Sequence, residues 1–259
     1  MPSPWEVLRL LFFSYFFVVA VIIFDRKMAV GFWRELLTSS FFSLLQLLLI
    51  GFIILFFLKL KTPLYNLLFL LFFYFNASLI ALRRLETLYY SKLKAFLIIF
   101  LSISLLSTFS LLLLYGAGVL TLSATSVIPL GGIITAAGMR SLSLAFKYYA
   151  GKVKDLEGVI LGMVALGAPD GDIFKFLFRQ IIDDITVPVR DMFRSAGIVH
   201  IPGVMVGLLL AGAFPLKAAL FQFVILSTMV FQFTFTPAIA LFLMVWFFGF
   251  KFPLGDRNG

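Results

Sequence analysis

Cysteine is absent from this 259-residue sequence, and histidine occurs only once. A chain without cysteine forms no disulfide, no thiolate metal site and no cysteine nucleophile. The lone histidine, His200, excludes the histidine pair of a metalloprotease, and an isolated histidine is more often a hydrogen-bonded core residue than a ligand. The sequence leaves open whether the chain itself ligates a metal.

Nucleotide-binding and hydrolytic motifs are also missing. The closest approach to a Gly-x-x-x-x-Gly-Lys phosphate loop is Gly151-Lys152, but Phe146 stands where the first glycine belongs. Asp183 and Asp184 are adjacent and would point in different directions from a helix, unlike two carboxylates that face one substrate. We expect them to be solvated or paired with Arg179 and Arg190, and we expect no enzyme and no cofactor on this chain.

Apolar residues make up 62% of the sequence and charged residues only 13%. A globule of this size could not hide so much apolar surface, so the sequence predicts an all-α, polytopic membrane protein. The apolar runs reach helix length and lack the period of two that is typical of a membrane barrel. The basic residues are scattered rather than gathered on one helix, which argues against nucleic acid as a partner.

Seven spans can be drawn within one transmembrane domain, residues 1–259. Each is long enough for a hydrocarbon core of ~30 Å at ~1.5 Å per residue. The sixth is broken, and the seventh is long enough to need a tilt or a bend. The spans are Val7–Phe24, Leu36–Leu58, Leu64–Leu82, Ala95–Tyr115, Val127–Phe146, about Val189–Ala213, and Ala218–Phe248.

The orientation follows from the lysines and arginines. Most of the 21 fall in segments that share one side if the N-terminus is outside, and basic loops favour the cytoplasm. We therefore predict an N-out, C-in protein of the inner (plasma) membrane. Arg140 lies inside the fifth span, where it would snorkel or face the protein interior.

The stretch from Leu156 to Gly171 lies in the longest charge-bearing interval between apolar runs, a cytoplasmic region of about residues 147–197. Its helical pattern stops at Gly167, and Pro169 with Asp170 would start a new helix, so we predict a short helix between two turns. Residues 171–198 then read as an amphipathic helix interrupted by Pro188. The sequence leaves open whether this helix lies in the interface or enters the membrane beside an aqueous cavity.

Polar side chains within the spans are costly in lipid unless they face protein or water. The clearest are Gln46, Asn76, Gln222 and Gln232. Each could simply bond a neighbouring helix, whereas as a set they allow a weakly polar pathway.

Several segments resemble known permeases. Ala165-Leu166-Gly167-Ala168-Pro169 looks like the EAA loop of ABC importer-type permeases. Four further segments look like the FetB family of bacterial iron-export ABC permeases and related plant aluminium-tolerance proteins. They are Val127-Ile128-Pro129 with Gly132; Phe75-Asn76-Ala77 with Ala81 and Arg84; Gln46-Leu47 with Gly51; and Pro202-Gly203-x-Met205-x-Gly207 through Ala211-Gly212, Pro215 and Lys217-Ala218 to Gln222.

The sequence departs from the family pattern at three positions. Phe42 replaces a basic residue, Ala137 an amide, and Phe214 an acidic residue. If those side chains handle substrate in relatives, the substrate of this protein could differ.

The resemblance implies the membrane-spanning subunit of an ABC transporter that exports iron or a related metal or metal complex. It implies a permease homodimer, two ATPase subunits that bind ATP and Mg²⁺, and a lipid bilayer as partners. An ABC permease for another small molecule and a secondary carrier without an ATPase remain the alternatives. The expected coupling residues are Ala165, Leu166, Gly167, Ala168, Pro169, Asp170 and Gly171; the expected pathway residues are Gln46, Asn76, Asp191, Arg194, His200 and Gln222; the expected gate or hinge residues are Pro129, Pro202, Gly203 and Gly207.

Overall fold

The computed structural model describes residues 3–59, 63–85 and 91–249, and within these ranges the chain is helical. The β-structure found among them is one isolated bridge, between Ala196 and His200. The helices are α1 (Pro4–Met28), α2 (Trp33–Lys59), α3 (Pro63–Leu82), α4 (Lys92–Gly116), α5 (Ala124–Asp155), α6 (Glu157–Ala165), α7 (Asp170–Ser195), α8 (Gly203–Leu210) and α9 (Pro215–Phe248).

Six of these helices are long and apolar enough to cross a membrane: α1, α2, α3, α4, α5 and α9. Each contains one of the predicted spans and extends it by a few residues at one or both ends, because helices continue beyond the hydrocarbon core to a cap or a turn. The prediction of an all-α, polytopic membrane protein is confirmed.

The chain divides into two compact units, Met1–Lys61 and Thr62–Gly259. The first is a hairpin of α1 and α2, closed by Asp25. The carboxylate of this buried residue accepts hydrogen bonds from the backbone N–H groups of Gly31, Phe32 and Trp33, at 3.2, 3.3 and 2.9 Å. An anion at the first turn of α2 satisfies donors that the helix leaves unpaired and opposes its dipole, which fixes the turn.

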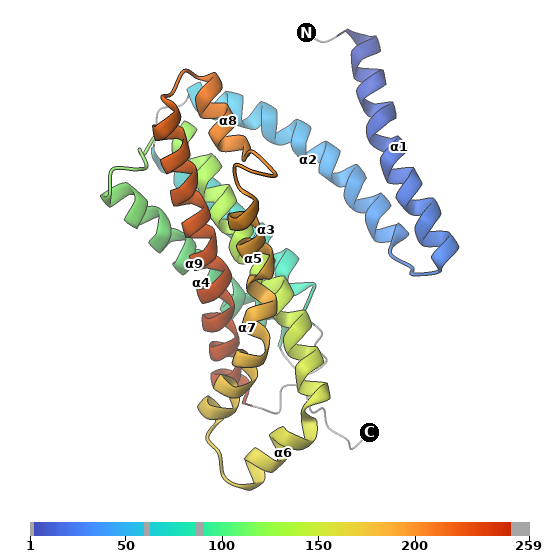
Figure 1. Ribbon diagram of the computed structural model, residues 1–259, viewed down its shortest axis with the longest axis vertical. Helices are drawn as coiled ribbons and strands as arrows, with labels where there is room; N and C mark the ends of the chain where they lie inside the picture. The colour runs from blue at the N-terminus through green and yellow to red at the C-terminus, as the bar shows by residue number, and fades with distance from the viewer. Residues whose placement is uncertain (1–2, 60–62, 86–90, 250–259) are drawn as a thin grey trace. The chain divides into compact units, whose positions relative to one another are not determined.

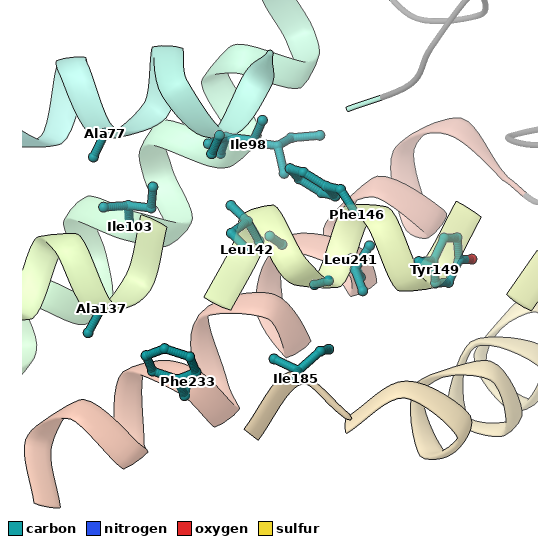
Figure 2. Packing of buried hydrophobic residues seen from close by; sticks show 14 of the residues in the cluster. Ala77, Ile98, Ile103, Ala137, Leu142, Phe146, Tyr149, Ile185, Phe233 and Leu241 are labelled. Carbon is teal, nitrogen blue, oxygen red and sulfur yellow. The ribbon is translucent and has the colours of Figure 1, made fainter. Parts of the chain in front are cut away.

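The second unit is built around α5, which contacts α3, α4, α7 and α9. Figure 2 shows the buried side chains that meet there, among them Ile103 of α4, Leu142 and Phe146 of α5, Ile185 of α7 and Leu241 of α9. Small residues let the helices approach. A Cβ added to Gly138 would lie 3.2 Å from Oε1 of Gln232 and 3.3 Å from Oγ1 of Thr236, both on α9.

Helix α6 is the predicted short helix between two turns. It ends in a Schellman motif: Gly167 has a φ of 78°, its N–H donates to the carbonyl of Val164, and the N–H of Ala168 donates to the carbonyl of Met163. Pro169 then caps the start of α7. The predicted coupling residues therefore do not form a helix of their own: Ala165 ends α6, Leu166 to Pro169 form the turn, and Asp170 and Gly171 begin α7.

Helices α7 and α8 connect α6 to α9, and neither is among the six candidate spans of the described residues, so the predicted sixth span, about Val189–Ala213, is not found as one apolar helix. In Figure 1, α7 rises from α6 at one end of the second unit, and α8 lies at the opposite end, beside the start of α9. The predicted interruption at Pro188 is wrong, since α7 runs without a break from Asp170 to Ser195. The helical structure is interrupted later, at residues 196–202 between α7 and α8.

Candidate translocation pathway

Helix α7 lies lengthwise against the membrane-spanning helix α9. Phe174 packs against Phe242, and Phe193 packs against Phe223, with ring centroids 5.7 and 5.8 Å apart. The two contacts are nineteen residues apart on both helices, or ~28 Å at ~1.5 Å per residue, close to the thickness of a hydrocarbon core. The α9 segment between them is centred in its uncharged run, so α7 runs alongside the part of α9 that a bilayer would cover, although α7 is not itself among the candidate spans.

One face of α7 is apolar and fully buried: Ile173, Leu177, Ile181, Ile185 and Val189 recur every four residues. The opposite face carries charges at helical spacing along the whole helix. Its members are Asp172, Lys175, Arg179, Asp183, Arg190 and Arg194, and we call this set the α7 charged face.

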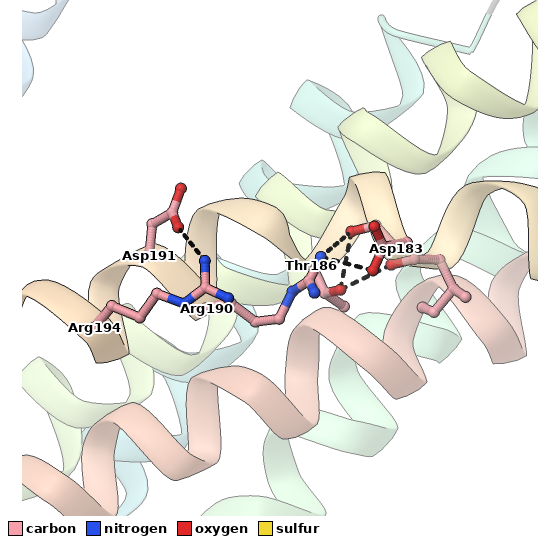
Figure 3. Close-up of polar contacts among 6 residues, drawn as sticks. Asp183, Thr186, Arg190, Asp191 and Arg194 are labelled. Atoms are coloured by element: carbon pink, nitrogen blue, oxygen red, sulfur yellow. Dashed lines mark hydrogen bonds and ion pairs between the residues drawn. The ribbon is translucent and has the colours of Figure 1, made fainter.

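The centre of the α7 charged face is an ion pair between Asp183 and Arg190, drawn in Figure 3. Nη2 of Arg190 lies 2.8 Å from Oδ1 of Asp183 and also donates to the Asp183 carbonyl at 2.9 Å. The Thr186 hydroxyl donates to the same carbonyl at 3.1 Å. Pro188, which has no N–H, also lies within this helix and removes the backbone donor to the carbonyl of Asp184, four residues earlier.

The α7 charged face cannot lie against lipid. The side chain of Asp183 is 77% exposed and that of Arg190 is 40% exposed. A single charged residue at the centre of a lipid-facing helix costs roughly 3 kcal/mol on insertion scales, and this face carries charges on several successive turns. This face is therefore directed at water or at another protein surface within the membrane.

A second polar cluster at the same depth is closed. Nε2 of Gln232 donates to Oγ of Ser110 at 3.0 Å, Oε1 of Gln232 accepts from Oγ1 of Thr236 at 2.8 Å, and Ser141 donates to the carbonyl of Gly138 at 2.9 Å. We call Ser110, Gly138, Ser141, Gln232 and Thr236 the closed cluster. Its side chains are buried, so Gln232 joins helices α4 and α9 within the core.

Three of the predicted pathway residues lie at a similar level, near the end of α7. Asp191 and Arg194 form an exposed ion pair at 3.4 Å, drawn in Figure 3. Gln222 directly precedes Phe223, which packs on Phe193, so it lies at the same depth. Gln222 is buried, and its Oε1 has no hydrogen-bond partner.

The other predicted pathway residues lie elsewhere. His200 belongs to the turn after α7, where its Nδ1 lies 3.1 Å from the Ser195 hydroxyl. The amide of Asn76 donates to the carbonyl of Phe72 in its own helix, at 2.8 Å. Gln46 is exposed on α2, in the first unit.

The predicted gate residues lie at the start of α8 and within α5, both in the second unit. Pro202 caps the start of α8, Gly203 is its first residue and Gly207 lies within it, directly after the break at residues 196–202. Pro129 lies inside α5 on its exposed side. Their role as a gate stays a prediction.

The predicted coupling residues project from the end of the second unit. Leu166 is 90% exposed, a high value for a leucine between two helices, and Asp170 and Gly171 are exposed at the first turn of α7. The turn continues directly into the helix that bears the charged face. A force applied to this turn would act on α7 without an intervening linker.

The sequence analysis did not assign Arg179, Asp183 or Arg190 to the pathway. It did predict the pairing of Asp183 with Arg190. The signal for a wider role was the charge period itself, which was assigned to the cytoplasmic side. Arg190 and Arg194 lie near the level at which Phe193 packs on Phe223, toward the N-terminal end of α9, and the orientation of the chain stays a prediction.

Residues 8–248 match the family described as "Uncharacterised protein family (UPF0014)". The chain is 28% identical over 215 residues to the probable iron export permease protein FetB of Escherichia coli K12, with 82% of each chain covered. It is 27% identical over 228 residues to the UPF0014 membrane protein STAR2 of rice, covering 87% of this chain and 78% of that protein. It is also 27% identical over 214 residues to the Arabidopsis protein ALUMINUM SENSITIVE 3, covering 82% and 77%.

No solved structure matches the chain. Within the described ranges, no three His, Asp or Glu side chains lie close enough together to hold a metal ion.

Proposed function

The chain belongs to the UPF0014 family, and on this premise we propose that it is the membrane-spanning permease subunit of an ABC transporter that exports iron or a related metal or metal complex. The name of the Escherichia coli relative, an iron export permease, supports the substrate and the direction. The plant relative named for aluminium sensitivity supports a metal more generally.

The observation that carries the proposal is the α7 charged face beside the centre of α9. A structural membrane protein has no need of such a face, whereas a transporter needs a polar lining across the bilayer. One chain supplies one such lining. A second copy related by a two-fold axis would place two charged faces around a shared aqueous pathway and shield both from lipid.

The energy source is a separate ATPase that docks on the α6–α7 turn. We take Leu166 as the apolar contact, because it is 90% exposed and flanked by two helix ends that fix its position. On ATP binding the two ATPases close and displace this turn, and the rigid connection to α7 tilts the charged face and alternates access. Hydrolysis then resets the cycle.

Co-purification tests the proposal. A tagged chain, extracted in mild detergent from its native host, is expected to retain a stoichiometric ATPase subunit. Leu166→Glu is expected to lose that subunit or its substrate-dependent stimulation, while Val164→Glu, an exposed α6 position before the turn, serves as the matched control. A chain that never retains an ATPase, yet still transports, would be a secondary carrier instead.

A further inference from the structure

Arg140 of α5 is a further exposed charged residue, at about the level of the centre of the α7 charged face. It is exposed on α5, two residues beyond Gly138, whose contacts with Gln232 and Thr236 fix its level on α9. Gln232 lies midway between Phe223 and Phe242, and Asp183 lies midway between Phe174 and Phe193. Arg140 and Asp183 therefore share nearly the same depth, at the centre of the bilayer.

The charges on these exposed surfaces do not cancel. The bilayer-depth charges on α5 and α7 are Arg140, Lys175, Arg179, Asp183, Asp184, Arg190, Asp191 and Arg194. Arg190 is paired with Asp183, and Arg194 is paired with Asp191. With Asp172 of the α7 charged face included, the remainder is three basic residues, Arg140, Lys175 and Arg179, against Asp172 and Asp184, and a second copy would double this positive surplus.

A bare metal cation finds little to bind on this lining. Iron ions take imidazole, thiolate or carboxylate ligands, several at once. The chain has no cysteine, and the part of it that the structure describes brings no three acidic or histidine side chains together. The carboxylates of Asp183 and Asp191 each already face an arginine, which opposes a cation further.

Arginine side chains at these positions favour a negatively charged substrate. A guanidinium presents its N–H donors in a planar fork that matches carboxylate oxygens, and such bonds strengthen away from bulk water. Building on the proposed function, we infer that the substrate enters this pathway as an anion with carboxylate oxygens, a metal bound to a small hydroxycarboxylate, and that Arg140 and Arg179 bind it.

Binding to the purified full chain in lipid nanodiscs tests this inference without an ATPase. Calorimetric titrations would use ferric citrate, citrate alone, and Fe²⁺ kept reduced by ascorbate. Ferric citrate is expected to bind at least tenfold more tightly than Fe²⁺. If citrate alone binds as tightly as ferric citrate, the site binds anions but the inference that the metal is part of the substrate is overturned. Tighter binding of Fe²⁺ than of ferric citrate would overturn the inference altogether.

Matched variants locate the site. Arg140→Gln and Arg179→Gln are each expected to weaken ferric citrate binding about tenfold, the loss of one charge-assisted contact. Arg140→Lys, which keeps the charge but loses the planar fork, is expected to bind with an affinity between those of the unmodified chain and of Arg140→Gln. Lys217→Gln removes the same charge at an exposed position near the start of α9, outside the depth of the charged face, and is expected to bind like the unmodified chain.

The outcomes separate this inference from the proposed function. Unchanged ferric citrate binding in both glutamine variants, each eluting as the same folded species as the unmodified chain, would overturn the assignment of the two arginines. An absent ATPase subunit would sink the ABC permease but leave these binding results intact. A retained ATPase that is stimulated by Fe²⁺ and not by ferric citrate would support the ABC permease but overturn the inferred anionic substrate.

Discussion

The closed cluster and the α7 charged face lie at the same depth in the second unit and use polar side chains in opposite ways. In the closed cluster, the side-chain amide of Gln232 forms hydrogen bonds with Ser110 and Thr236, and every member faces another helix. On α7, Asp183 and Arg190 pair with each other while their side chains stay accessible. A polar residue within a span is therefore not a transport site by itself. A buried polar side chain indicates helix packing, whereas an exposed one at the same depth indicates a role in transport.

The largest expected effect comes from forcing open the closed cluster. Gly138→Leu would place its side chain against Oε1 of Gln232, 3.2 Å from the glycine's Cβ position, and overpacking of this kind costs on the order of 3 kcal/mol. We expect a large loss of folded protein in a detergent unfolding assay. Gly151→Leu on the same helix, where nothing lies within 4 Å, is the control and should leave stability unchanged.

Removing the polar centre of that cluster should have a smaller effect on the same property. Gln232→Leu leaves Ser110 and Thr236 without their partner, at a cost of about 1–3 kcal/mol of stability. Transport per folded molecule should stay close to that of the unmodified chain. A variant of normal stability and lost transport would show instead that Gln232 belongs to the pathway.

A substitution on the α7 charged face should lower transport more than stability. Asp183→Asn removes the charge opposite Arg190 and is expected to lower transport by about tenfold, whereas an exposed ion pair contributes only ~0.5 kcal/mol to stability. Transport by reconstituted complexes and unfolding of the same sample would be compared. Equal loss of both quantities would make this ion pair structural.

Gln222 should give the smallest change in stability. Its Oε1 is buried without a partner, so Gln222→Leu is expected to change stability by less than ~0.5 kcal/mol, or to raise it slightly. Lower transport at unchanged stability would assign Gln222 to the pathway, as predicted for Asp191 and Arg194. A clear loss of stability would place it with the closed cluster.

The sequence predicted the apolar helices well because length and hydropathy decide them, as in α3, where the predicted and observed ends nearly coincide. It placed the short helix and the turn at Gly167, since glycine alone tolerates the left-handed conformation there. It missed the continuity of α7, because the burial of Ile181, Ile185 and Val189 in the core that α7 forms with α5 and α9 stabilises the helix across Pro188, and packing of this kind is not visible in the local sequence.

The depth of α7 could not be read from the sequence for a related reason. Its charges lower its mean hydropathy below that of a span, so it resembles a surface helix. Only the contacts of Phe174 with Phe242 and of Phe193 with Phe223 show that it lies along a spanning helix. The roles of Asn76, Gln46 and the gate residues stay predictions, because amide side chains serve packing and transport equally well.

The central claim is that the α7 charged face lines water across the membrane, and the chain suits a direct test because it contains no cysteine. Single cysteines would be placed along α7 in reconstituted complexes and treated with a membrane-impermeant, charged thiol reagent. We predict rapid labelling at positions 179, 183, 186 and 190 and protection at positions 177, 181 and 185, a helical period through mid-depth. Protection of all the mid-depth positions, or equal labelling on both faces, would contradict the account.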